Sequence, residues 1–242
     1  MLPGFWLLTF ISFVIGTIIQ FRDRSKIIPE HWLRVILSDI PWHEWFPCNT
    51  LHFDRGVVAS GPHGLLCCGT LAGIHFVKGS KTCMCIAPIV FYVPIIGMIA
   101  RKLGCIPADY HHMKLALQMG FPILVVPGGV PEIVMMEAAD DQLKFKRHGF
   151  LRIAADVNAP VHAVHVQGEC NTYKLFKGPF FNTRIYISWI LNIPIVMPII
   201  IGYYGTWIPK RTPLKLITCQ LKQYEPKHYQ QILQKIYNEH TD

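Results

Sequence analysis

The 242-residue sequence contains few charged residues. Asp, Glu, Lys and Arg make up 16% of the chain, against roughly 25% in an ordinary soluble domain. Hydrophobic residues account for 51%, and the mean hydropathy is +0.31. This composition excludes a disordered or fibrous protein. The length suits one domain with a substantial core rather than two full domains.

Several patterns that would indicate other functions are missing. The chain has no dense run of Lys and Arg, no cysteine spacing typical of a zinc module, and no Gly-x-Ser-x-Gly nucleophile elbow. We therefore predict no nucleic-acid partner and no metal site, and a hydrolase is disfavoured. The formal net charge of +8 favours anionic partners such as lipid headgroups or phosphate groups.

The eight cysteines do not indicate a disulfide framework. Two of their clusters, Cys67-Cys68 and Cys83-Met84-Cys85, lie inside apolar runs, where a reduced thiol behaves as a small hydrophobic group. We expect reduced, buried cysteines, which points to a reducing compartment that faces the cytosol.

Residues 2–21 carry no formal charge. Twenty helical residues span about 30 Å, the thickness of a bilayer's hydrocarbon core. The cations Arg22, Arg24 and Lys26 follow this stretch, which favours a retained anchor with the main domain on the cytoplasmic side. We predict a transmembrane anchor over residues 1–21, and a buried N-terminal helix is the alternative.

Residues 22–50 combine aromatic and charged residues, among them Trp32, Trp42, Trp45 and Phe46. This mixture is typical of a bilayer interface, and we interpret the segment as an interfacial aromatic linker to a domain over 51–242. Two later apolar stretches, 86–100 and 185–202, are interrupted by prolines. Each is either core or a surface that dips into the membrane, and the core interpretation is favoured.

From about residue 50 onward, short β-rich runs alternate with helical patterns. Strands are predicted over 56–60, 83–87, 122–126 and 161–166, and helices over 65–76, 94–102, 110–119, 150–157 and 227–240. Asp109 is a plausible helix N-cap. The alternation predicts an α/β fold, a mostly parallel sheet flanked by helices. Active groups of such folds gather in loops beyond the carboxyl ends of the strands.

The first such loop carries His63 between Gly61-Pro62 and Gly64. Glycine and proline make a tight, open turn that exposes the imidazole, as a general base acting near neutral pH requires. A hydrogen-bonded structural histidine is the alternative.

The second loop contains Pro127-Gly128-Gly129 and then Glu132. Its glycines let a substrate approach the backbone, whose N–H groups could face an acceptor or a developing oxyanion. Glu132 is a candidate to hold a substrate hydroxyl or to support the base. An ordinary strand-to-helix turn fits the pattern equally well.

The third loop carries the cations Lys144, Lys146 and Arg147 before a helix that begins near Gly149 and Phe150. Cations beside a helix N-terminus suit phosphates, such as those of coenzyme A, although a solvated basic loop is the usual explanation. Glu169, after the strand over 161–166, is a second carboxylate candidate.

Together, these motifs resemble in their order the type-2 diacylglycerol acyltransferase family. That family includes monoacylglycerol acyltransferases and wax ester synthases, and it is a branch of the glycerolipid acyltransferases. The resemblance covers roughly residues 56–176. It is carried by His63-Gly64, by Gly128-Gly129-x-x-Glu132, by Arg147-x-Gly149-Phe150 and by Gly168-Glu169-x-x-x-Tyr173.

The resemblance implies a glycerolipid-acyltransferase-like fold and a membrane enzyme of the endoplasmic reticulum whose catalytic domain faces the cytosol. It implies acyl-CoA as co-substrate, no cofactor, and a neutral lipid acceptor, either diacylglycerol or monoacylglycerol, with a long-chain alcohol as a third choice. The oligomeric state stays open, a homo-oligomer included. The implied catalytic residues are His63 and Glu132, and the implied substrate contacts are Gly64, Gly128, Gly129, Lys144, Lys146, Arg147, Gly149, Phe150 and Glu169.

The sequence departs from the family at two positions. Gly61 stands where the first motif usually has another histidine, and Cys68 stands five residues after His63, where the wider acyltransferases have an acid. Glu132 or Glu169 is then the candidate to orient the base. The second motif lacks the arginine of phosphate-binding acceptor sites, which favours a neutral acceptor. A weakly active or inactive lipid-binding protein of the same fold is the alternative function.

Overall fold

The computed structural model describes residues 32–61, 67–93, 95–128, 148–176, 199–206 and 208–238, and isolated positions at 179, 180, 183 and 186. The anchor predicted over 1–21 lies outside the described residues. Among the residues described, no helix combines the length and the apolar character that a membrane crossing needs.

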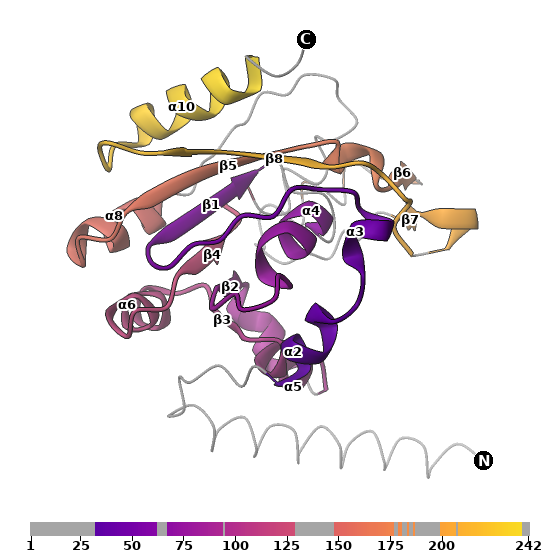
Figure 1. Ribbon diagram of the computed structural model, residues 1–242, viewed down its shortest axis with the longest axis horizontal. Coiled ribbons are helices and arrows are strands. Elements are labelled where there is room, and N and C mark those ends of the chain that lie inside the picture. Colours follow the sequence, from indigo (N-terminus) through magenta and orange to yellow (C-terminus); the bar gives the residue numbers. More distant parts are fainter. Residues whose placement is uncertain are drawn as a thin grey trace.

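A six-stranded sheet forms the centre of the molecule (Figure 1), in the order β3-β2-β4-β1-β5-β8. The first five strands are parallel, and β8 pairs antiparallel with β5 at one edge. The mostly parallel α/β sheet predicted from the sequence is thereby confirmed. The strands are β1 (Val57–Gly61), β2 (Cys83–Ile86), β3 (Cys105–Pro107), β4 (Ile123–Val125), β5 (Val161–Gln167) and β8 (Lys215–Gln220).

The helices fall close to the predicted segments, and the predicted cap is present, because the Asp109 side chain accepts a hydrogen bond from the His112 N–H at 2.9 Å. A second, two-stranded sheet pairs β6 (Lys174–Phe176) with β7 (Ile199–Ile201). The helices are α2 (Trp32–Ser38), α3 (Trp42–Trp45), α4 (Cys68–Thr70) with the π-helix η1 (Leu71–His75), η2 (Pro88–Tyr92), α5 (Ile96–Lys102), α6 (Tyr110–Gln118), α8 (Gly149–Asp156), η3 (Glu169–Asn171), η4 (Tyr203–Gly205) and α10 (Pro226–Asn238).

Both faces of the sheet are covered. Alternate residues of β1 point to opposite sides, so Val57 and Ala59 join a core with α6, α8 and α10, whereas Val58 packs with Ile74 of η1 and Leu216 of β8. All five residues of β1 are buried, as is typical of central strands in parallel sheets. Part of the chain's high hydrophobic content is therefore used to bury this sheet on both sides.

The described part of the predicted linker, residues 32–50, packs against the domain. The Trp42 ring stacks on Phe76 with a centroid separation of 5.5 Å, and Phe46 is buried. The Trp45 indole N–H donates to the Pro209 carbonyl at 3.0 Å. In the structure these aromatic side chains therefore contribute to the packing of the domain.

The apolar stretch over 86–100 ends β2 and then forms η2 and most of α5. Phe91, Gly97 and Ala100 are buried, but most of the other described residues of this stretch are exposed. The favoured core interpretation is thus wrong for the outer face of this segment. Most of the second stretch, 185–202, lies outside the described residues.

Candidate functional site

Three neighbouring parallel strands, β4, β1 and β5, end at one edge of the sheet. Gly61 ends β1, Gly128 lies just beyond β4, and Glu169 lies just beyond β5. The topology thus brings together the strand ends that carry three of the predicted motifs. The other predicted members of the site, His63, Gly64, Gly129, Glu132, Lys144, Lys146 and Arg147, lie outside the described residues.

The predicted loop that contains His63, residues 62–66, connects β1 with α4 in the sequence and lies outside the described residues. A hydrogen bond of 2.7 Å joins the Ser60 and Thr70 hydroxyl oxygens across the base of this loop, and both residues are buried. At the exit, Cys67 has a φ of 51°, a left-handed conformation uncommon for a residue other than glycine. The two ends of the loop are therefore held by rigid elements.

The buried carboxylate of Glu169, which follows β5, binds the backbone at the start of α4. Its Oε1 accepts the Cys68 N–H at 2.7 Å, and its Oε2 accepts the Gly69 N–H at 2.8 Å. Backbone N–H groups at a helix start have no partner within the helix, and they favour a negative charge. Because the residue is only 1% exposed and both oxygens are occupied, Glu169 supports the first turn of α4.

Glycine is required where this contact forms. A Cβ atom on Gly69 would lie 2.5 Å from the Val166 Cγ1 and 3.1 Å from the Glu169 Oε2. The turn that presents the carboxylate also needs glycine, since Gly168 has a φ of 89° and a Cβ there would lie 2.6 Å from the Pro213 carbonyl oxygen. Both glycines let the backbone come close enough for the carboxylate to reach α4.

The remainder of the Gly168 to Tyr173 motif packs around the same helix. The Thr172 hydroxyl donates to the Glu169 carbonyl at 2.7 Å and so stabilises the turn η3. Tyr173 belongs to a buried cluster with Cys68 and Phe46. In the sequence, Tyr173 stood out only as a motif position, and no pattern singled out Ser60, Thr70 or Thr172, because hydroxyl side chains that bond across a turn or loop have no sequence signature of their own.

Burial sets the protonation behaviour of this cluster. Removal from water raises the pKa of Glu169 from an ordinary 4.5 to about 7, although the two backbone N–H donors favour the ionised form. Burial, with the Glu169 carboxylate nearby, raises the pKa of the Cys68 thiol far above its usual range. Cys68 therefore stays protonated and does not act as the acid that the wider family has at this position.

The described members of the third motif lie at the start of α8. Phe150 is buried in the main core, and its ring meets Tyr229 of α10 edge to face at a centroid separation of 5.2 Å. Gly149 begins the helix, and a Cβ atom there would meet open space. Within the described residues, Phe150 thus makes packing contacts that fix α8 against α10.

None of the eight cysteines forms a disulfide, and five of them are buried as predicted, whereas Cys48 and Cys170 are partly exposed and Cys219 is exposed. Burial raises the pKa of Cys83 and of Cys105 to about 12, and it raises that of Cys85 well above the ordinary value. Thiols of this kind are poor nucleophiles near neutral pH, since the thiolate is the reactive form.

Comparison with known proteins gives three findings. The family model described as diacylglycerol acyltransferase matches residues 3–223. Diacylglycerol O-acyltransferase 1 of Eremothecium gossypii is 22% identical over 175 residues, which cover 69% of this chain and 38% of that protein. The chain thus matches well under half of that relative's length.

The third finding concerns a solved structure, the 1-acyl-sn-glycerophosphate acyltransferase PlsC from Thermotoga maritima. The match covers 95% of both chains at 14% identity, with a TM-score of 0.48. Similarity of this degree is too low to establish a common fold.

The raised pKa of Glu169 predicts a pH dependence of stability. Between pH 4.5 and about 7 the folded state holds a proton on Glu169 that the unfolded state has lost. The contribution of this group is therefore full below pH 4.5 and falls by about 3 kcal/mol as the pH rises to about 7. Urea titrations at a series of pH values should show this fall in the wild type and a flatter profile in Glu169→Gln.

The variant should also be less stable throughout, because its amide N–H₂ would face a backbone N–H donor of α4. Glu44→Gln is the matched control, since Glu44 is exposed on α3 and its replacement should leave the wild-type profile intact. Parallel pH profiles for the wild type and Glu169→Gln would contradict the assignment.

Proposed function

Because the chain belongs to the diacylglycerol acyltransferase family, we propose that it transfers a fatty acyl group from acyl-CoA to the hydroxyl group of a neutral lipid. The observation that carries this proposal is the family match over residues 3–223. Diacylglycerol and monoacylglycerol are the favoured acceptors, with a long-chain alcohol as the third, and the type-2 branch is the proposed placement within the family. The enzyme is proposed to act at the membrane of the endoplasmic reticulum, with its domain on the cytosolic side.

In the proposed reaction, His63 accepts the proton of the acceptor hydroxyl while the oxygen attacks the thioester carbonyl. Backbone N–H groups at Gly128-Gly129 stabilise the tetrahedral oxyanion. The intermediate then collapses with cleavage of the C–S bond, and His63 returns the proton to the departing coenzyme A thiolate. One ester forms and one thioester breaks, so neither an enzyme-bound acyl group nor a metal ion is required.

Glu169 is proposed as a positioning residue for this reaction. Its carboxylate and the pair formed by Ser60 and Thr70 fix both ends of the loop 62–66. Fixed ends restrict the conformations of a five-residue loop, and a catalytic group gains from being held close to its reactive geometry. This support replaces the acid expected at Cys68, and Glu132 stays the candidate for direct contact with the base or the acceptor.

The cations Lys144, Lys146 and Arg147 are proposed to bind the phosphates of coenzyme A, next to the start of α8 at Gly149. The competing function is a lipid-binding protein without turnover. It is motivated by Gly61 and Cys68, the two departures from the family pattern. The activity of the wild type and of a His63 variant separates the two.

Replacement of the base should abolish turnover. The full chain in liposomes, given labelled acyl-CoA and a panel of neutral and phosphorylated acceptors, should form product with a neutral acceptor. Product formation should fall at least about a hundredfold in His63→Ala, the usual scale for loss of a general base. His111→Ala, at an exposed position of α6, should keep wild-type activity. Equal product from His63→Ala, or none from the wild type with any acceptor, would refute this assignment.

The positioning role of Glu169 predicts coupling to His63. Glu169→Gln should lower kcat and leave the KM for acyl-CoA near its wild-type value, because the carboxylate supports the base and not the donor site. In the double variant His63→Ala/Glu169→Gln, activity should equal that of His63→Ala alone, since residues that act as one unit show non-additive losses. Losses that multiply after correction for the folded fraction would show that Glu169 contributes to stability only.

The basic loop predicts a selective effect on the donor. Changing Lys144, Lys146 and Arg147 together to Ala should raise the KM for acyl-CoA several-fold and leave the KM for the acceptor unchanged, because only the donor carries phosphates. The matched control is Lys222→Ala/Lys227→Ala, which removes cations from exposed positions elsewhere. An unaltered KM for acyl-CoA would exclude the loop from donor binding.

A further inference from the structure

Apolar side chains gather on the outside of α2, η2 and α5. Six aliphatic side chains there are between 50% and 61% exposed: Val35, Ile36, Ile89, Ile95, Ile96 and Met98. The two helices α2 and α5 pack against each other, and both lie at one end of the molecule (Figure 1). Isolated exposed aliphatic residues are ordinary on a soluble protein, but six of them on elements that pack together, α2 with α5 and α5 with η2, indicate an interaction surface.

The inner side of this layer is well packed, so the exposure is not a result of loose structure. Phe91, Ala100 and Cys105 form a buried cluster beneath it. On α2 the Arg34 guanidinium turns inward and donates to the Thr82 carbonyl at 2.7 Å. The outward faces are then occupied by aliphatic residues, where a solvated helix would carry polar ones.

The backbone at Ile95 adds to this observation. Ile95 precedes α5 with a φ of 64°, a left-handed conformation that is unfavourable for a β-branched residue. Its side chain is nevertheless 61% exposed and gains little from burial in the protein. Glycine would suit this backbone better, so an isoleucine here indicates a function for the exposed side chain.

The charges around the surface are mostly positive, and the exception is Asp39 just after α2, whose carboxylate lies 4.0 Å from the Lys78 ammonium. No Asp or Glu occurs from residue 55 to residue 108, whereas Lys81, Arg101 and Lys102 lie next to β2 and at the end of α5. The Arg101 guanidinium lies 5.1 Å from the centre of the buried Phe91 ring. An apolar face edged by cations is complementary to a bilayer with anionic headgroups.

We propose that α2, η2 and α5 form a membrane-docking surface, which inserts its aliphatic side chains at the headgroup boundary of an anionic bilayer. The segment η2 leaves β2 at the sheet edge where β1 and β4 also end, so the docked surface adjoins the candidate site. A second copy of the chain is a poorer occupant, because it would bring the cations Lys81, Arg101 and Lys102 of two chains to one interface. The proposal does not depend on the catalytic assignments.

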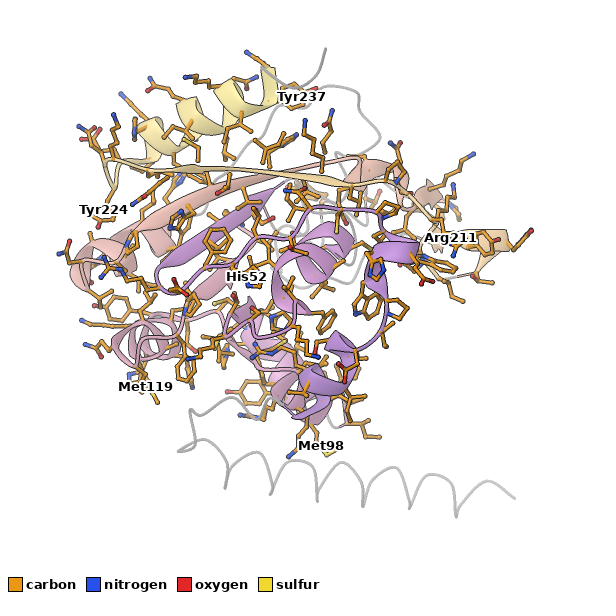
Figure 2. All side chains as sticks on the ribbon, in the orientation of Figure 1. His52, Met98, Met119, Arg211, Tyr224 and Tyr237 are labelled. Atoms are coloured by element: carbon orange, nitrogen blue, oxygen red, sulfur yellow. The ribbon has the colours of Figure 1, made fainter. Side chains whose placement is uncertain are left out.

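Insertion of this surface into a bilayer is tested with a fluorescent dye attached at position 98. Figure 2 shows Met98 at the opposite end of the molecule from Tyr237, with Met119 at a separate side position. Full-length Met98→Cys in a Cys219→Ser background, which removes the exposed cysteine, is labelled with an environment-sensitive fluorophore. Met119→Cys in the same background is the control, because Met119 is similarly exposed on the loop after α6.

Vesicles of phosphatidylcholine and phosphatidylserine should shift the emission at position 98 to the blue, reduce its quenching by iodide several-fold, and allow quenching by spin-labelled lipids. The dye at 119 should stay accessible to iodide. Pure phosphatidylcholine vesicles should shield position 98 less, because the cations lose their partners. Equal iodide quenching with and without vesicles would overturn the proposal. So would shielding before vesicles are added, since another part of the chain or a second copy would then cover the surface.

The variant Ile95→Gly tests whether the exposed side chain contributes to membrane docking without contributing to the stability of the fold. It removes an exposed aliphatic side chain and relieves the left-handed backbone, so the thermal midpoint should be equal to or higher than that of the wild type. The shielded fraction of the dye at 98 should fall, whereas Met119→Ser should leave it unchanged. An unchanged shielded fraction in Ile95→Gly, or a fall in the thermal midpoint, would contradict a docking role for this side chain.

Discussion

The contact between the Glu169 carboxylate and the first turn of α4 joins segments a hundred residues apart. Without it, two buried N–H groups would lose their partners, and the end of β5 would no longer be tied to the loop after β1. An unpaired buried donor is costly, and a helix start is the place in a fold where donors most need an acceptor. The candidate site therefore depends on one acid that lies far away in sequence.

Much of the fold could be predicted from the sequence because its signals are local. Strand and helix segments follow from apolar periodicity, and the cap at Asp109 is a preference of one side chain for its own helix start. The short edge strand β3 and the antiparallel strand β8 were not predicted. A three-residue strand carries too little pattern, and strand direction is set by long-range pairing.

The structure places three of the predicted motifs at neighbouring strand ends, whereas the roles of their residues stay predictions. The motifs after β1 and β4 and the carboxylate candidate after β5 were expected in one site, and the three strands are neighbours. Glu169 was predicted only as a candidate to orient the base. Its contact with α4 and the requirement for glycine at Gly69 could not be predicted, since both arise from long-range contacts that leave no periodic pattern in the sequence. The same limit applies to residues 86–100, where buried and exposed positions are equally apolar in sequence.

Burial of Cys68 has a chemical consequence for the proposed transfer from a thioester. A thiolate beside a bound thioester would capture the acyl group by exchange between sulfurs and leave the protein modified on itself. Cys68 lies next to the loop that contains His63, but burial raises the pKa of its thiol, which therefore stays protonated and is a poor nucleophile. In the proposed reaction, burial of this sulfur would leave the lipid hydroxyl as the nucleophile, so that self-acylation at Cys68 would not divert the donor.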